Sequence, residues 1–273
     1  MLKRKIPSSG EELPLVGLGT WQTFDVAGKQ QYPALKEVLN ELHHAGGRLI
    51  DSSPMYGRSE AVIGNITADM ETRDDFFYAT KVWTTGLQAG IKQMESSMQK
   101  MQRKTVDLMQ IHNLTDWQTH LPVLRDWKES GKIRYIGITH YTDSMHAELE
   151  RIIKKEPIDF VQFNYSIDAR HAEKSLLKAA LDRGVATIIN RPFGEGRLFN
   201  KANGKGLPLW ATELGIATWS AFFLKFIISH PAVSCVIPAT ANPHHAKDNF
   251  MAGAGYIPDE ATREKMAVYL DKL

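Results

Sequence analysis

The chain has 273 residues, of which 43% are hydrophobic, and its 33 basic and 31 acidic residues leave a formal net charge of only +2. This balance provides no extended field for nucleic acid or an anionic membrane, and no apolar run approaches the roughly 18 residues of a membrane span. The single cysteine, Cys235, excludes an internal disulfide and a thiolate-only metal site, and its apolar neighbours predict a buried, inert thiol. A soluble domain that acts on a small molecule fits best.

Apolar runs rich in Val, Ile, Phe and Tyr recur after a short opening hairpin around Ser8–Gly10. In chain order, the predicted strands are 14–20, 48–53, 76–82, 106–113, 133–139, 159–166, 185–192 and 233–240. Most are followed by a segment with helical spacing, which is typical of βα units around a parallel sheet. We therefore predict an α/β fold, a (β/α)8 TIM barrel with a short N-terminal hairpin, as a single domain over 1–273. An open doubly wound sheet is the alternative.

The helical segment 209–229 carries a stripe of large apolar side chains. Its members follow the spacing i, i+3, i+4, i+7, i+8 and are Trp219, Phe222, Phe223, Phe226 and Ile227. The spacing predicts a helix packed on the outward-facing side chains of the strands, and a partner-binding face is the alternative.

Polar side chains gather at the carboxyl ends of the predicted strands. They are Thr20, Asp51, Lys81, His112, Thr139, Gln162, Arg191 and Thr240. In a barrel this end is the active-site face, so residues far apart in the sequence are expected to meet there.

Four of the polar residues near these strand ends form a pattern with specific chemistry. The segment LIDSSPMYGRSE ends a strand with Asp51 and presents Tyr56 from the following loop, while Lys81 and His112 end the next two strands. This pattern resembles the aldo-keto reductase family, and the resemblance runs from GLGTW (17–21) to PATANPHHAKDN (238–249). It implies a small, bacterial-type member with short loops that reduces carbonyl groups, with these four residues as the catalytic set.

The chemistry of the four side chains supports the same interpretation. Reduction of a carbonyl places hydride on carbon and a proton on oxygen. At neutral pH Tyr56 is protonated but is a weak proton donor, and a cationic Lys81 beside it is expected to lower its pKa. Asp51 would hold the ammonium group in place, and His112 would donate a hydrogen bond to the carbonyl oxygen. Taken singly, each residue has a structural alternative, such as a buried ion pair or an aromatic side chain at the rim.

No G-x-G-x-x-G motif follows a strand and opens a helix, so a Rossmann site is not expected. The resemblance instead implies NADPH, or NADH as the alternative, extended across the top of the barrel. The cofactor-binding positions that it implies are Gly19, Thr20, Trp21, Asp51, Thr139, His140, Gln162, Asn190, Arg191, Pro192, Phe193, Pro238, Thr240, Asn242, His245, Asp248 and Asn249. Thr139 and Gln162 are expected to hold the carboxamide, and Thr240, Asn242, Asp248 and Asn249 to contact the 2′-phosphate, ribose or adenine.

Three positions depart from the family pattern. His140 stands where an asparagine is common, and Asn190 where a tyrosine usually stacks on the nicotinamide. His245 replaces an arginine that usually clasps the 2′-phosphate. Arginine binds phosphate through two parallel bonds and is always charged, whereas a histidine is only partly cationic near pH 7. Affinity for NADPH is therefore expected to be modest.

The substrate positions implied by the resemblance are Trp21, Met55, Tyr56, Trp83 and His112. The apolar members favour an uncharged aromatic or aliphatic carbonyl compound, although the tryptophans could simply pack the rim. We expect no metal ion, no nucleic acid or membrane partner, and a monomer or weak homo-oligomer. The cytoplasm is the expected location, with a removed targeting segment left open.

Two other functions compete with the reductase. A metal-dependent barrel hydrolase or isomerase would use the same strand-end Asp51, Lys81 and His112, but the rim offers few metal ligands besides Asp51 and His112. The second competing function is a sensor or regulatory barrel that binds a nicotinamide cofactor with little turnover. A sequence does not measure turnover, so this alternative stays open.

Overall fold

The computed structural model describes residues 1–273 and contains a parallel sheet of eight strands whose spatial order follows their sequence order. The strands are β3 (Leu18–Gly19), β4 (Leu49–Asp51), β5 (Phe77–Val82), β6 (Val106–Ile111), β7 (Ile133–Thr139), β8 (Phe160–Asn164), β9 (Ala186–Asn190) and β10 (Cys235–Val236). Each predicted strand is confirmed, although all except β7 are shorter than expected, the first and last most of all. The predicted barrel is therefore confirmed.

A seam between the first and last strands closes the sheet. Single parallel bridges join Val16 to Val236 and Gly19 to Ala239, so the open-sheet alternative is wrong. A Cβ atom on Gly19 would lie 2.8 Å from the carbonyl oxygen of Ile237, and only glycine permits this approach of the two backbones.

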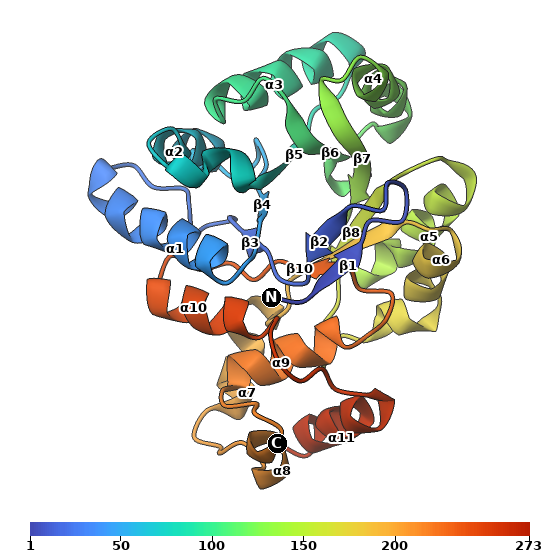
Figure 1. Cartoon of the computed structure of the whole chain (residues 1–273). Coiled ribbons are helices and arrows are strands. Elements are labelled where there is room, and N and C mark those ends of the chain that lie inside the picture. The colour runs from blue at the N-terminus through green and yellow to red at the C-terminus, as the bar shows by residue number, and fades with distance from the viewer.

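The predicted hairpin is present and covers one end of the barrel. Its strands β1 (Lys3–Lys5) and β2 (Glu12–Pro14) pair antiparallel, and Figure 1 shows them lying across the opening. Ile6 and Leu13 from this region join a buried cluster with inward-facing strand residues such as Phe77 and Phe160. Cys235 belongs to the same cluster, which confirms its predicted burial. Because side chains fill the barrel interior at this end, a ligand can enter the barrel only from the opposite end, at the strand carboxyl termini.

Helices surround the strands (Figure 1). They are α1 (Tyr32–His44), α2 (Ser59–Thr67), α3 (Leu87–Lys100), α4 (Trp117–Glu129), α5 (His146–Lys155), α6 (Leu176–Asp182), α7 (Arg197–Ala202), α8 (Leu209–Glu213), α9 (Trp219–Ile228), α10 (Pro243–Met251) and α11 (Glu260–Asp271). Strands in a barrel are covered on both faces, and in β5 every residue is buried, including Thr80 and Lys81. None of the helices has the length and apolar character needed to cross a membrane.

The segment 209–229 forms two helices, α8 and α9, rather than one. Gly215 has a positive φ of 76°, and the Thr218 side chain accepts the amide hydrogen of Ala221 and so caps the second helix. The predicted apolar stripe lies on α9, where Phe222 and Phe223 are fully buried. The stripe is therefore core.

Candidate active site

A cavity of about 630 Å³ opens at the carboxyl ends of the strands. Many of the residues predicted from the sequence line it. These are Gly19, Thr20, Trp21, Asp51, Met55, Tyr56, Trp83, His112, Thr139, Gln162, Asn190, Arg191, Pro192 and Phe193. The structure thus brings the predicted substrate positions and the nicotinamide end of the predicted cofactor site to one cavity.

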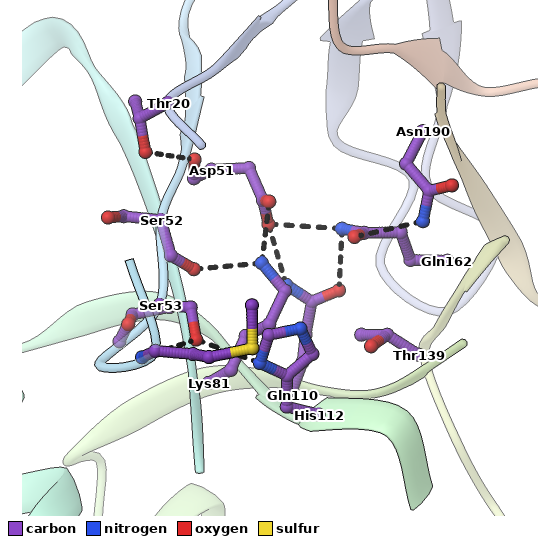
Figure 2. A network of polar contacts seen from close by, with 12 residues as sticks. Thr20, Asp51, Ser52, Ser53, Lys81, Gln110, His112, Thr139, Gln162 and Asn190 are labelled. Atoms are coloured by element: carbon purple, nitrogen blue, oxygen red, sulfur yellow. Dashed lines mark hydrogen bonds and ion pairs between the residues drawn. The ribbon is translucent and has the colours of Figure 1, made fainter. Parts of the chain in front are cut away.

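Lys81 lies beside this cavity, buried against Asp51. Its Nζ atom is 2.6 Å from Asp51 Oδ2 and 2.8 Å from the carbonyl oxygen of Ser52, and the two charged side chains are 0% and 2% exposed. The same nitrogen lies 5.1 Å from the centre of the Tyr56 ring. Lysine, aspartate and tyrosine therefore lie close together, as expected (Figure 2 shows the lysine and aspartate).

The turn after β4 places Tyr56. Gly57 has a φ of 61°, and a Cβ atom there would meet the Asp25 carboxylate at 2.5 Å. That carboxylate accepts the amide hydrogen of Arg58 at 3.0 Å, and the Tyr56 amide donates to the carbonyl oxygen of Ser53 at 3.0 Å. A glycine is needed in this conformation, which explains the Tyr-Gly pair in the sequence.

The charge states of the lysine and tyrosine follow from burial and from each other. Burial disfavours the cation of Lys81, but the negative charge and hydrogen bond of Asp51, together with Tyr56, outweigh burial and raise its pKa. Burial also raises the pKa of Tyr56, and Lys81 only partly opposes this effect. Lys81 thus acts on the pKa of the tyrosine in the expected downward direction, but desolvation of the hydroxyl is the larger effect and the net shift is upward.

His112 is neutral. Burial, the charge of Lys81 and the neighbouring His140 lower its pKa to about 2. Its Nδ1 atom is 2.8 Å from the Ser53 hydroxyl oxygen, and its ring meets the Tyr56 ring edge-to-face at 5.6 Å between centres. A neutral imidazole at this site can offer one N–H group to a ligand.

Asp51 is held by a wider network of buried amides (Figure 2). Its Oδ1 atom accepts hydrogen bonds from Gln110 at 2.9 Å and Gln162 at 3.0 Å. The Gln162 side chain also donates to the Gln110 oxygen and accepts from Asn190. One carboxylate oxygen therefore accepts a hydrogen bond from the lysine, and the other accepts hydrogen bonds from two glutamines. Sequence reasoning missed Gln110, although it stands two residues before His112 in the predicted strand 106–113, a spacing that places two side chains on one face of a strand.

Other cavity residues were also missed. They are Gln22, Thr23, Asn113, Tyr141, Glu195, Gly196, Phe199, Ile237 and Ala239. Arg191 organises part of this region, because its guanidinium lies 4.4 Å from the centre of the Tyr141 ring and 2.8 Å from the Glu195 carboxylate. Arg191 and Glu195 both have positive φ values, of 52° and 58°, which no sequence pattern indicated.

The predicted adenosine end lies outside the cavity. The residues concerned are Pro238, Thr240, Asn242, His245, Asp248 and Asn249, and His140 also contributes no lining surface. Asp248 accepts a hydrogen bond from Thr218 at 2.9 Å, and buried Asn249 accepts one from Ser220, so these two side chains join α10 to α9. Their role toward a cofactor stays a prediction.

Three buried polar atoms of residues that line the cavity lack a hydrogen-bond partner. Thr23 Oγ1, Asn113 Oδ1 and Asn190 Oδ1 are buried without a hydrogen-bond partner, and all three residues line the cavity. Buried polar atoms are normally paired, so these three are candidate partners for a polar group of a ligand, such as a carboxamide. By contrast, no group of three or more His, Cys, Asp or Glu side chains is placed to hold a metal ion.

A parallel barrel with a lysine–aspartate pair, a tyrosine and a neutral histidine at its open end defines a class of barrel oxidoreductases. The chain belongs to the aldo/keto reductase family, whose model matches residues 15–266.

Two curated relatives support this assignment. The chain is 25% identical over 213 residues to the aldo-keto reductase YhdN of Bacillus subtilis (strain 168), a match that covers 72% of this chain and 63% of YhdN. It is 27% identical over 229 residues to the NADH-specific methylglyoxal reductase of Escherichia coli (strain K12), covering 71% and 69%. The match thus spans less than two thirds of the length of YhdN.

Solved structures share the fold over the whole chain. An aldo-keto reductase of Klebsiella pneumoniae in complex with NADPH matches with a TM-score of 0.80 and 22% identity, over 99% of this chain and 96% of that one. A thermostable aldo-keto reductase solved with the inhibitor epalrestat matches with the same TM-score and 26% identity, over 99% and 100%.

Proposed function

We propose that this protein reduces the carbonyl group of a small aldehyde or ketone to an alcohol, using NADPH and a proton from Tyr56. The observation that carries the proposal is the Lys81 ammonium group, fixed by Asp51 and 5.1 Å from the Tyr56 ring beside the cavity. Family membership supports the same reaction class.

A bound nicotinamide cofactor would supply the hydride. Tyr56 would supply the proton. Its raised pKa keeps the hydroxyl protonated at neutral pH, so a proton is available for transfer. Transfer of that proton leaves a phenolate, which the adjacent Lys81 cation stabilises. Asp51 keeps the ammonium group charged and in place, because its Oδ2 atom accepts a hydrogen bond from Lys81.

His112 would orient the substrate rather than give up a proton. Its pKa of about 2 leaves it neutral at cellular pH. An N–H group of a neutral imidazole can donate to the carbonyl oxygen as negative charge develops there. Tyr56 and His112 line the same cavity with their rings in contact, so both can reach one oxygen atom.

An apolar carbonyl compound is the proposed substrate class. Trp21 and Trp83, which are 36% and 43% exposed, line the cavity together with Met55, Phe193 and Phe199. Arg191 is paired with Glu195 and is therefore not free to attract an anionic substrate.

The cofactor is proposed to lie with its carboxamide among Thr139, Gln162 and Asn190, where unpaired Asn190 Oδ1 is available. Its adenosine end would extend past the seam toward α10. The proposed contacts there are Thr240, Asn242, His245, Asp248 and Asn249.

We also propose that the protein is a single-domain monomer or weak homo-oligomer and that it resides in the cytoplasm. Size-exclusion chromatography tests the oligomeric state, and cell fractionation tests the location.

NADPH is expected to be preferred over NADH in spite of His245. Replacement His245→Arg should raise the ratio of kcat/KM for NADPH to that for NADH by about tenfold, because arginine adds a second parallel bond to a phosphate. Steady-state kinetics with both cofactors measure the ratio, and kcat/KM for NADH in the same variant is the control. A wild-type kcat/KM ten times higher with NADH would refute the preference.

The proposed reaction can be tested by following NADPH absorbance with a panel of aromatic and aliphatic aldehydes. Oxidation of NADPH in the presence of a chelator is the expected result. Tight NADPH binding with no oxidation across the panel would favour the sensor instead. Neither binding nor oxidation of NADPH would leave the metal-dependent hydrolase or isomerase as the alternative.

A further inference from the structure

Ser53 lies two residues after Asp51, and its hydroxyl is buried next to His112. The residue is fully buried, and its Oγ atom lies 2.8 Å from His112 Nδ1 (Figure 2). The backbone amide of Met55 donates a hydrogen bond to the same oxygen at 3.2 Å. These two are the only hydrogen-bond partners of the hydroxyl.

The direction of the hydrogen bond between Ser53 and His112 follows from these partners. A serine hydroxyl has one hydrogen to donate and two lone pairs that accept. Met55 offers only a hydrogen, so the hydroxyl hydrogen of Ser53 has one possible acceptor, His112 Nδ1, and no access to solvent. A buried hydroxyl without an acceptor would be unfavourable.

We propose that Ser53 is a positioning residue that keeps the proton of the His112 ring on Nε2 by donating its own hydrogen to Nδ1. The proposal rests on the function proposed above. His112 Nε2 has no partner in the protein, and the residue lines the cavity, so the proton on this nitrogen is available to a ligand. The opposite tautomer would present a lone pair to a carbonyl oxygen, and two acceptors repel.

The tautomer can be observed directly by NMR of protein labelled with ¹⁵N in its histidine rings. The chain has 10 histidines, and loss of one signal set in His112→Gln assigns this ring. We expect a protonated Nε2 and an unprotonated Nδ1 in the wild type, and a mixture of tautomers in Ser53→Ala. A wild-type ring protonated on Nδ1, or an unchanged ring in Ser53→Ala, would overturn the proposal. The wild-type spectrum decides even where the variant folds poorly.

Kinetics test whether the tautomer matters for turnover. Ser53→Ala is expected to lower kcat about tenfold, less than the loss of a whole oxyanion donor, with little change in KM. In a His112→Gln background the same substitution should have no further effect, because Ser53 acts only through the imidazole. Equal losses in both backgrounds would contradict this role. Ser97→Ala, which removes a buried hydroxyl on α3, is the matched control.

The two measurements separate the proposals from each other. A wild-type protein that reduces no carbonyl compound would end the reductase proposal, whereas the ring spectrum would still report the hydrogen bond between Ser53 and His112. An active enzyme with the wrong tautomer would end only the role of Ser53.

Discussion

Tyr56→Phe is expected to lower kcat/KM for carbonyl reduction by about 10³-fold, within the range that one positioned proton donor contributes. The substitution removes a single oxygen atom and keeps the ring that contacts His112 and lies over Lys81. Steady-state kinetics with the best aldehyde of the panel measure the loss. Cofactor affinity, measured by fluorescence titration, should stay close to that of the wild type.

The pH profile provides a second check on Tyr56 as the proton donor. Reduction needs the protonated phenol, so activity is present below the pKa of Tyr56 and is lost as pH rises through it. Because burial raises that pKa, kcat/KM should stay flat up to about pH 10, the ordinary value of a phenol. His112, with a pKa of about 2, should contribute no acidic limb between about pH 5 and 8. A limb in that interval, or a Phe variant with a tenth of wild-type activity, would contradict the proposed roles of Tyr56 and His112.

Lys81→Met is expected to lower the free energy of unfolding by about 3–5 kcal/mol and to abolish reduction. The lysine and its partner Asp51 are buried, so removal of the cation leaves a buried carboxylate without its counter-ion. The hydrogen bonds from Gln110 and Gln162 to Asp51 remain, but they do not replace a charge. Urea denaturation of wild type and variant measures the difference.

The control for this substitution is Lys178→Met, which breaks an exposed pair with Asp182. That change should cost no more than about 0.5 kcal/mol. The double variant Asp51→Asn with Lys81→Met removes both charges, so it should regain much of the lost stability while remaining inactive. Equal destabilisation by the two lysine substitutions would show that the buried pair has no special importance.

The barrel and the catalytic face could be predicted because they depend on regular geometry. Parallel strands that alternate with helices bring all strand ends together, so Asp51, Lys81 and His112 could be grouped before any coordinates were known. The same rule placed Thr139 and Gln162 correctly in the cavity. The strand-end rule does not place Tyr56, since this residue comes from a loop. The glycine after it was the sequence feature that indicated its role.

The features that were missed depend on backbone conformation or burial. Arg191 and Glu195 form their ion pair in a segment where both adopt positive φ values, which residues of these types seldom do. Gln110 lies on the same strand face as His112, but its role depends on the distance to Asp51 across two strands. The shift in the pKa of Tyr56 also needed coordinates, because a sequence names the neighbouring cation and does not give the depth of burial.

The seam between the first and last strands links ligand binding to the integrity of the barrel. β3 and β10 each have only two residues, and few backbone hydrogen bonds join the two edges, among them Gly17 to Val236 and Gly19 to Pro238. Such a short pairing is a natural place for local opening. Thr20 lies on one edge of the cavity and Ala239 on the other, so a ligand that contacts both holds the edges together. Its binding free energy then adds to the resistance of the whole barrel to unfolding.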